Sequence, residues 1–122
     1  MASSDESAIE SVVLDYFEGW FEGDAARMQR ALHPELAKRS PGADGALQSD
    51  SAQEMIEATA QGVGKARLPE GGDPRIELDV VDVYDTIAAV VVRSAVYREY
   101  IHMVRTPAGW KVANALWQRT LP

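Results

Sequence analysis

The sequence predicts one α+β domain, in which three helices pack on a curved antiparallel sheet. Apolar residues recur every three to four positions in the first half of the chain and every second position after about residue 75. Helices that precede a run of strands are typical of α+β domains, where the helices cover one face of the sheet. The length of 122 residues suits one domain, so we expect residues 1–122 to form a single folding unit.

The N-terminal segment predicts an amphipathic helix. Ser3 and Glu6 match the capping-box pattern at its start, and Gly23 supplies a residue that tolerates the left-handed conformation at its end. Its apolar stripe has members three and four residues apart, namely Ile9, Val12, Val13, Tyr16, Phe17, Trp20 and Phe21. We expect this stripe to be buried.

A second, shorter helix is predicted after Asp24, because aspartate is a favoured N-cap residue. This helix passes through Met28 and ends at His33-Pro34, since proline disfavours helical geometry in the residue before it. An extended segment is predicted for residues 35–40, and a polar loop follows it as far as Asp50.

The third helix begins at a second capping box, which is formed by Ser51 and Glu54. Its apolar face comprises Met55, Ile56, Thr59, Ala60 and Val63. Gly62 and Gly64 end the helix, and the glycine, proline and charge content of residues 65–74 predicts a long loop.

The remaining chain predicts four strands joined by tight turns. Alternation in the first strand begins at Ile76 and is broken at Val80-Val81, which indicates a β-bulge that bends the strand. The other three strands are expected at about residues 87–95, 99–105 and 110–120. A bent sheet covered by helices forms a cone whose open end is a natural ligand pocket.

Composition and charge exclude several classes of function. Nineteen acidic residues against twelve basic ones give a net charge of −7, which repels phosphate backbones and anionic membrane surfaces. We therefore expect no nucleic-acid partner. The absence of cysteine excludes disulfides, thiolate nucleophiles and cysteine-ligated metals.

The sequence also gives no sign of a membrane or secretory segment. Asp5 and Glu6 lie where a secretory signal would carry basic residues. The longest apolar run, residues 87–92, has six residues, far fewer than the roughly 20 of a membrane helix. We expect no membrane partner and a cytoplasmic location.

Four segments together resemble a known superfamily. They are Gly19-Trp-Phe-Glu-Gly-Asp24, Ala31-Leu-His-Pro-Glu-Leu-Ala-Lys-Arg39, Tyr100-Ile-His-Met103 and Gly109-Trp-Lys-Val112. Their order and spacing resemble nuclear transport factor 2-like proteins, most closely the putative lumazine-binding group. The resemblance covers nearly the whole chain and implies a cone-shaped, cystatin-like α+β fold with a ligand-binding pocket. For function it implies little, because this fold hosts many unrelated activities.

Ketosteroid isomerases share this fold and allow a sharper comparison. Their mechanism uses a tyrosine and a protonated aspartate to hold an oxyanion, while another aspartate transfers the proton. Tyr16 resembles the isomerase tyrosine, since it lies eight residues before Asp24. Counting along the chain places Ser40 at the position of the base and Tyr100 or Ile101 at that of the second oxyanion donor. None of these three is a carboxylic acid, so this isomerase chemistry is not expected.

Seven residues are candidates for the lining of an aromatic pocket in the cone. They are Tyr16, Trp20, Ser40, Met55, Thr59, Met103 and Trp117. The resemblance places Trp117 on the inward face of the last strand together with Ala113 and Ala115, which would leave room for a flat ligand. Tyr16 and Trp20 are alternatively core aromatics whose polar tips find a partner, and other side chains could fill the space beside Trp117.

Three further residues have both a functional and a structural interpretation. His33 is expected to satisfy carbonyls of the last helical turn, or to act as an acid-base group. His102 lies opposite in face to Ile101 and Met103 and is expected on the outer face. Lys38 shares strand parity with Ser40, so it either points into the cone or is a solvated lysine on an edge strand. Two separate histidines predict no metal site, and no cofactor motif is present.

These observations leave three hypotheses. The first is a protein that binds a small apolar or heteroaromatic ligand in the seven-residue pocket. The second is an enzyme of polyketide-cyclase, dehydratase or isomerase type that uses Tyr16, with Lys38 or His33 as further acid-base groups. The third is a homodimer or interaction module, whose outer sheet face would present Leu116, Val112, Trp110 and His102.

Overall fold

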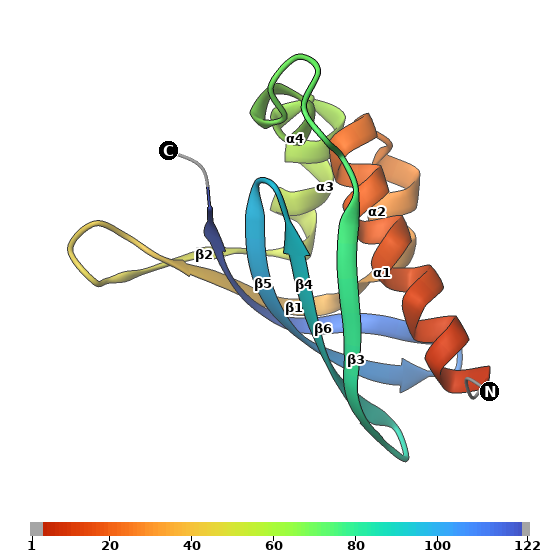
Figure 1. The fold of residues 1–122 in the computed structure, drawn as a ribbon. Coiled ribbons are helices and arrows are strands. Elements are labelled where there is room, and N and C mark those ends of the chain that lie inside the picture. Colours follow the sequence, from red (N-terminus) through yellow and green to blue (C-terminus); the bar gives the residue numbers. More distant parts are fainter. Residues whose placement is uncertain (1–3, 121–122) are drawn as a thin grey trace.

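The computed structural model describes residues 4–120 and has four helices on one side of a six-stranded sheet (Figure 1). The helices are α1 (Ser4–Glu22), α2 (Ala25–Ala31), α3 (Ala52–Ala60) and α4 (Val63–Arg67). The strands are β1 (Leu32–Pro41), β2 (Leu47–Asp50), β3 (Ile76–Tyr84), β4 (Ile87–Ser94), β5 (Tyr97–Thr106) and β6 (Gly109–Arg119). The predicted α+β class with a curved sheet is confirmed.

The sheet has the strand order β2-β1-β6-β5-β4-β3. All neighbouring strands are antiparallel except β1 and β6, which run parallel. The predicted bulge in β3 is confirmed, because the pairing with β4 shifts between Val80 and Asp82. Strong curvature turns the inner face of the sheet around α1 and α3 (Figure 1).

Helix boundaries follow the local capping signals. Asp24 accepts a hydrogen bond from the backbone N–H of Arg27 at 3.2 Å. Ser51 and Glu54 form the complete capping box of α3, with bonds of 3.1 and 2.9 Å. Gly23 has the expected left-handed φ of 74° after α1. Ser3, the other predicted cap, lies outside the described residues.

Two elements lie where the sequence predicts loops. Strand β2 occupies the end of the predicted polar loop and pairs with β1, so that Lys38 lies opposite Asp50. Its residues are mostly exposed and show no apolar alternation, which removes the usual strand signal. Gly62 has a left-handed φ of 79°, so the helical conformation of α3 does not continue through it, and α4 begins at the next residue. The structure therefore has a fourth helix.

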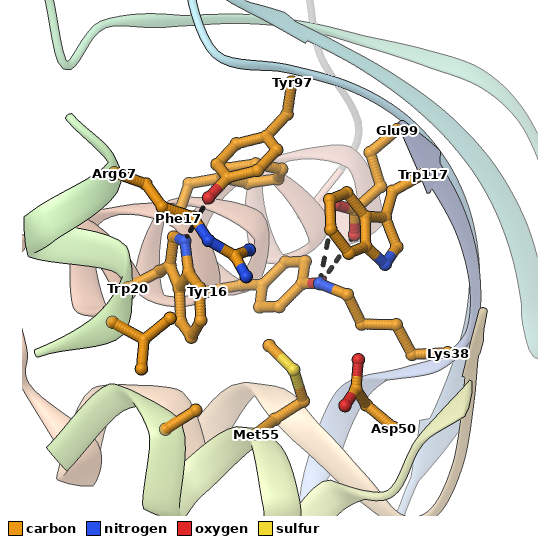
Figure 2. A pocket seen from close by; sticks show the side chains of 12 residues that line it. Tyr16, Phe17, Trp20, Lys38, Asp50, Met55, Arg67, Tyr97, Glu99 and Trp117 are labelled. Atoms are coloured by element: carbon orange, nitrogen blue, oxygen red, sulfur yellow. Dashed lines mark hydrogen bonds and ion pairs between the residues drawn. The ribbon is translucent and has the colours of Figure 1, made fainter. Parts of the chain in front are cut away.

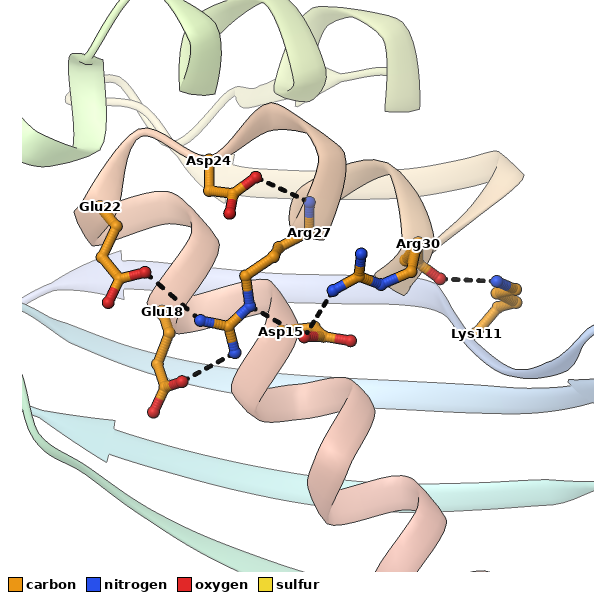
Figure 3. A network of polar contacts seen from close by, with 7 residues as sticks. All are labelled: Asp15, Glu18, Glu22, Asp24, Arg27, Arg30 and Lys111. Carbon is orange, nitrogen blue, oxygen red and sulfur yellow. Dashed lines mark hydrogen bonds and ion pairs between the residues drawn. The ribbon is translucent and has the colours of Figure 1, made fainter.

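A polar network joins α1 to α2 on the side away from the sheet (Figure 3). The guanidinium of Arg27 contacts Asp15, Glu18 and Glu22 at 2.9, 2.7 and 3.3 Å. At the other end of α2, the Lys111 ammonium donates to the carbonyl of Arg30 at 2.6 Å. Helix α2 is thereby fixed in orientation against α1 and β6.

The expected role of His33 is wrong in detail. Its Nδ1 accepts a hydrogen bond from the backbone N–H of Glu35 at 3.0 Å, at the start of β1. The carbonyl of the last helical turn is satisfied by Lys111 instead. His33 therefore binds the backbone within the first residues of β1.

The predicted composition of the outer sheet face needs correction. His102 and Leu116 are exposed there, as expected, but Trp110 and Val112 are buried at 3% and 0% exposure. The cause is a second bulge, because Val112 pairs with Met103 while Asn114 pairs with His102. The extra residue between them inverts side-chain alternation, so both halves of β6 present large residues to the core.

No described helix is long and apolar enough to span a membrane.

Candidate functional site

A cavity lies between the helices and the inner face of the sheet (Figure 2). The cavity has a volume of about 90 Å³. Four of the seven predicted pocket residues line it, namely Tyr16, Trp20, Met55 and Trp117. They come from α1, α3 and β6, which is the arrangement expected for the inside of a cone.

The other three predicted residues are buried but do not line this cavity. Ser40 is 7% exposed on β1, one inward position beyond Lys38. Thr59 is fully buried on α3, where its hydroxyl donates to the carbonyl of Met55 at 2.7 Å. Met103 is 1% exposed and belongs to the hydrophobic core.

Three polar side chains meet at the inner end of the cavity and form what we call the polar cluster: Tyr16, Lys38 and Glu99. The Tyr16 hydroxyl donates to Glu99 Oε2 at 2.6 Å, and Lys38 Nζ donates to the same hydroxyl oxygen. Lys38 Nζ also lies 3.6 Å from Glu99 Oε1. Helix α1 and strands β1 and β5 each contribute one member, so the cluster exists only in the folded chain.

Aromatic rings surround the Lys38 ammonium. Its Nζ lies 4.7 Å from the centre of the Tyr16 ring and 5.3 Å from that of Trp117. Lys38 is only 7% exposed, so the alternative of a solvated edge lysine is wrong. Strand β1 is covered on both sides by β2 and β6, and it is not an edge.

Burial changes the proton affinities of two members of the cluster. Desolvation lowers the pKa of Lys38 from its ordinary value of 10.5, although the Glu99 carboxylate acts in the opposite direction. Desolvation also raises the pKa of Tyr16 well above 10.0, and the Glu99 charge adds to this effect. The site therefore favours a neutral phenol beside an amine that gives up its proton more readily than a surface lysine.

Glu99 is the functional candidate that the sequence interpretation missed. Counting back from Trp117 points to Tyr100 or Ile101, but the carboxyl group that reaches Tyr16 belongs to Glu99, and it is 2% exposed. The alternation of side chains along a strand could have identified Glu99. If Ile101 and Met103 point inward, Glu99 must do so as well.

The wall of the cavity combines aromatic rings with one arginine. Trp20 Nε1 donates to the Tyr97 hydroxyl at 2.9 Å, and the Tyr97 ring makes an edge contact with Trp117. The Arg67 guanidinium lies 5.8 Å from the Trp20 ring and 5.7 Å from the Trp117 ring. Figure 2 places Arg67 between these walls, where α4 borders the cavity.

Side chains that can accept hydrogen bonds and others that can donate them line the cavity. Asp50 and Glu99 supply carboxylate oxygens, while Lys38 and Arg67 supply cations. The buried Nε1 of Trp117 has no hydrogen-bond partner within the described part of the chain. A buried, unpaired N–H costs free energy, which an acceptor on a ligand would recover.

Metal binding finds no support in the described residues. No group of three histidine, aspartate or glutamate side chains between residues 4 and 120 is close enough to hold a metal ion.

Solved structures with this architecture define the class of protein. A nuclear transport factor 2-like protein of unknown function from Silicibacter pomeroyi superposes with a TM-score of 0.73 at 17% identity, over 98% of this chain and 99% of that chain. A similar protein from Shewanella baltica gives 0.72 at 14% identity over the whole of both chains. A ketosteroid isomerase-like protein from Erwinia carotovora gives 0.64 at 15% identity, over 99% and 100% of the two chains. The chain thus has the nuclear transport factor 2-like fold.

The family within this class follows from the sequence itself. The profile described as "Putative lumazine-binding" matches residues 4–118, nearly the entire chain, so the protein belongs to that family. Comparison with curated protein sequences gives no match.

Proposed function

We propose that this protein binds a small, flat molecule with a carbonyl group, whose oxygen lies against the polar cluster. The observation that carries this proposal is the convergence of the Tyr16 and Lys38 donors at the inner end of an aromatic cavity. A carbonyl oxygen can accept from Lys38, or from Tyr16 when the phenol hydrogen turns to it from Glu99. Flat rings can stack on the indoles of Trp20 and Trp117.

Heteroaromatic diones such as lumazine fit this chemistry. Lumazine has two ring carbonyls and ring N–H groups on one flat bicyclic frame. Asp50 and Glu99 can accept from the ring N–H groups, while Lys38 and the unpaired Trp117 N–H can donate to its carbonyls. The family description supports this class of ligand.

Size restricts how such a ligand is held. The cavity volume of 90 Å³ is smaller than the roughly 150 Å³ cavity that holds a benzene molecule in a dry protein core. It is also well below the roughly 300–1,000 Å³ of ordinary ligand pockets. We therefore expect one ring to enter beside Tyr16 and the rest of the ligand to displace the Arg67 side chain.

Calorimetric titration and thermal unfolding with lumazine test this proposal. We expect lumazine to raise the melting temperature and Tyr16→Phe to weaken binding about tenfold, through the loss of one hydrogen bond. Tyr84→Phe is the matched control, since Tyr84 is 75% exposed. The proposal is wrong if neither lumazine nor related ring carbonyl compounds bind or stabilise the protein.

A second candidate is an enzyme of isomerase or dehydratase type. The observation in its favour is Lys38 in contact with Tyr16 at the cavity, with a pKa lowered by burial, because a lower pKa increases the share of neutral amine that can act as a general base. Lys38 would remove a proton from the carbon beside a carbonyl, and Tyr16 would stabilise the resulting oxyanion. Exchange of these protons of butanone in deuterated water, followed by NMR, distinguishes the enzyme from a binder. Tyr16→Phe should abolish that exchange.

We also propose that two copies associate through the outer sheet face. Tyr100 and Leu116 are cross-strand neighbours there, at 51% and 47% exposure. Exposed aromatic and aliphatic area of this kind marks interfaces. Sedimentation at micromolar concentration should give a dimer that Leu116→Arg dissociates; a monomeric profile for the unaltered protein contradicts the proposal.

A further inference from the structure

The side chain of Lys38 is placed to act as a nucleophile as well as a hydrogen-bond donor. Its Nζ faces the cavity, contacts the Tyr16 hydroxyl oxygen and lies between the Tyr16 and Trp117 rings. The chain has two other lysines, Lys65 and Lys111. Lys65 is exposed, and Lys111 donates to a helix carbonyl near the surface.

We propose that Lys38 Nζ forms an imine with small aldehydes or ketones that enter the cavity beside Tyr16. This inference rests on the proposed function for the presence of a carbonyl compound in the cavity. It goes further by assigning Lys38 a covalent step, with the carbonyl carbon as the reacting atom.

The step balances without an oxidant or a reductant. The Nζ lone pair forms the new N–C bond while the carbonyl π electrons move to oxygen. One amine proton passes to that oxygen and gives a neutral carbinolamine. The second amine proton then passes to the same oxygen, the C–O bond breaks, and water leaves as the C=N bond forms.

Tyr16 is placed to relay both protons. Its oxygen contacts Lys38 Nζ, and its hydrogen is directed at Glu99 across 2.6 Å. The phenol stays neutral in this buried place because desolvation and the Glu99 charge raise its pKa. When the phenol hydrogen turns from Glu99 to the substrate oxygen, Tyr16 passes this hydrogen to that oxygen as it takes one from Lys38 Nζ, so the phenol is unchanged after each transfer.

The charges around Lys38 decide how much free amine is present. Glu99 and Asp50 favour its ammonium form, whereas burial and the Arg67 charge favour the amine. Desolvation is the largest of these effects and lowers the pKa of Lys38. Lysines that form imines in other proteins are activated in the same way, by an apolar environment or a neighbouring cation.

Reductive trapping on the complete protein tests the proposal. Propanal and sodium cyanoborohydride are added at about pH 6.5, where surface lysines with pKa values near 10.4 are almost fully protonated. Propanal is small enough for the cavity, whose 90 Å³ is several times the roughly 10–15 Å³ that a single water needs. Peptide mapping by mass spectrometry then gives the propylated fraction of each lysine and of the N-terminal amine.

We expect the labelling rate of Lys38 to exceed those of Lys65 and Lys111 by about tenfold or more, since a positioned proton-transfer group contributes roughly 10²-fold or more. Tyr16→Phe should slow labelling of Lys38 about tenfold and leave Lys65 unchanged. Lys65 and Lys111 serve as controls within the same molecule, so the main result needs no variant. Equal or slower labelling of Lys38, or labelling of the N-terminal amine alone, overturns the proposal.

A parallel titration with lumazine separates this inference from the proposed function. Lumazine binding without preferential labelling of Lys38 overturns the imine and leaves the binding function intact. Preferential labelling without lumazine binding supports the imine and contradicts the heteroaromatic ligand. Where both occur, we expect saturating lumazine to protect Lys38 from propanal at least tenfold.

Discussion

The Tyr16 hydroxyl donates a hydrogen bond to the Glu99 carboxylate across 2.6 Å, although the two residues are 83 positions apart in the sequence. This bond joins the longest helix to the inner face of the sheet. It also places a neutral phenol between a carboxylate and the Lys38 amine. The stability of the fold and the chemistry of the cavity therefore depend on the same three side chains.

Replacement of Tyr16 by phenylalanine should destabilise the fold. The substitution keeps the ring but removes the donor to buried Glu99 and the acceptor for Lys38. Loss of one partner of a buried polar group costs about 1–3 kcal/mol in the free energy of unfolding. Urea denaturation measures it, and exposed Tyr84→Phe should stay within about 0.5 kcal/mol of the unaltered protein. A cost for Tyr16→Phe no larger than that of the control would contradict the buried hydrogen bond.

The contribution of the Lys38–Glu99 pair is measured by a double-mutant cycle. Lys38→Met and Glu99→Leu each leave an uncompensated buried group, and each should cost about 3–5 kcal/mol. The double variant should cost less than the sum of the two by more than about 1 kcal/mol. The Arg93–Asp79 pair is the matched control, because its side chains are 42% and 68% exposed at a separation of 2.8 Å. Its coupling should be at most about 1 kcal/mol, and a coupling at Lys38–Glu99 no larger than this would contradict an interacting buried pair.

Stability should depend on pH through Lys38 in a direction opposite to that of an ordinary surface ion pair. Its folded pKa is below 10.5, so between the folded value and 10.5 the unfolded chain binds more protons and stability increases with pH. The free energy of unfolding of the unaltered protein, minus that of Lys38→Met, should therefore rise as the pH increases towards 10.5. A difference that falls over this interval would mean that Glu99 outweighs burial.

Above pH 10, ionisation of Tyr16 should determine how the stability of the fold changes with pH. Its folded pKa is well above the ordinary 10.0, so the unfolded chain loses the phenol proton first and stability falls as pH rises. Tyr16→Phe should remove this fall in denaturant titrations at about pH 10 to 11. Equal losses in the unaltered protein and in the variant would assign the effect to other tyrosines.

A side chain at Gly64, where α4 borders the cavity, should destabilise the fold. A Cβ there would lie 2.4 Å from the Trp20 carbonyl oxygen and 2.5 Å from its ring, so the helix or Trp20 must move. Gly64→Ala should cost about 1–3 kcal/mol, as expected for overpacking, and change the near-ultraviolet circular dichroism of the tryptophans. Ala66→Ser, on the exposed side of the same helix, should change neither property. An unaltered spectrum for Gly64→Ala would contradict the close contact.

Local signals in the sequence predicted most of the fold. Asp24 and the Ser51–Glu54 box fixed two helix starts, and the break at Val80 located the bulge in β3, because each is a short-range property of a few residues. Strand β2 has no apolar alternation and is specified by its pairing with β1, which no local pattern records. The bulge near Ala113 likewise arises from pairing, and it reversed the expected faces of Trp110 and Val112.

The candidate site was predicted in its aromatic part and missed in its polar part. Tyr16 and Trp20 follow from the helical stripe, and Trp117 from the resemblance. Lys38 was left open between two interpretations, since its burial depends on β2 covering an apparent edge. Glu99 was missed because positions were counted from the chain end across a bulged strand, where a count is off by one or two residues.

The most direct test of the proposed function is a crystal structure of the protein with lumazine bound. We expect one lumazine carbonyl oxygen within hydrogen-bond distance of Tyr16 Oη or Lys38 Nζ, with the ring beside Trp20 or Trp117 and the Arg67 side chain displaced. Lumazine elsewhere on the protein, with the Tyr16–Lys38–Glu99 cluster unchanged and the cavity unoccupied, would contradict the proposal.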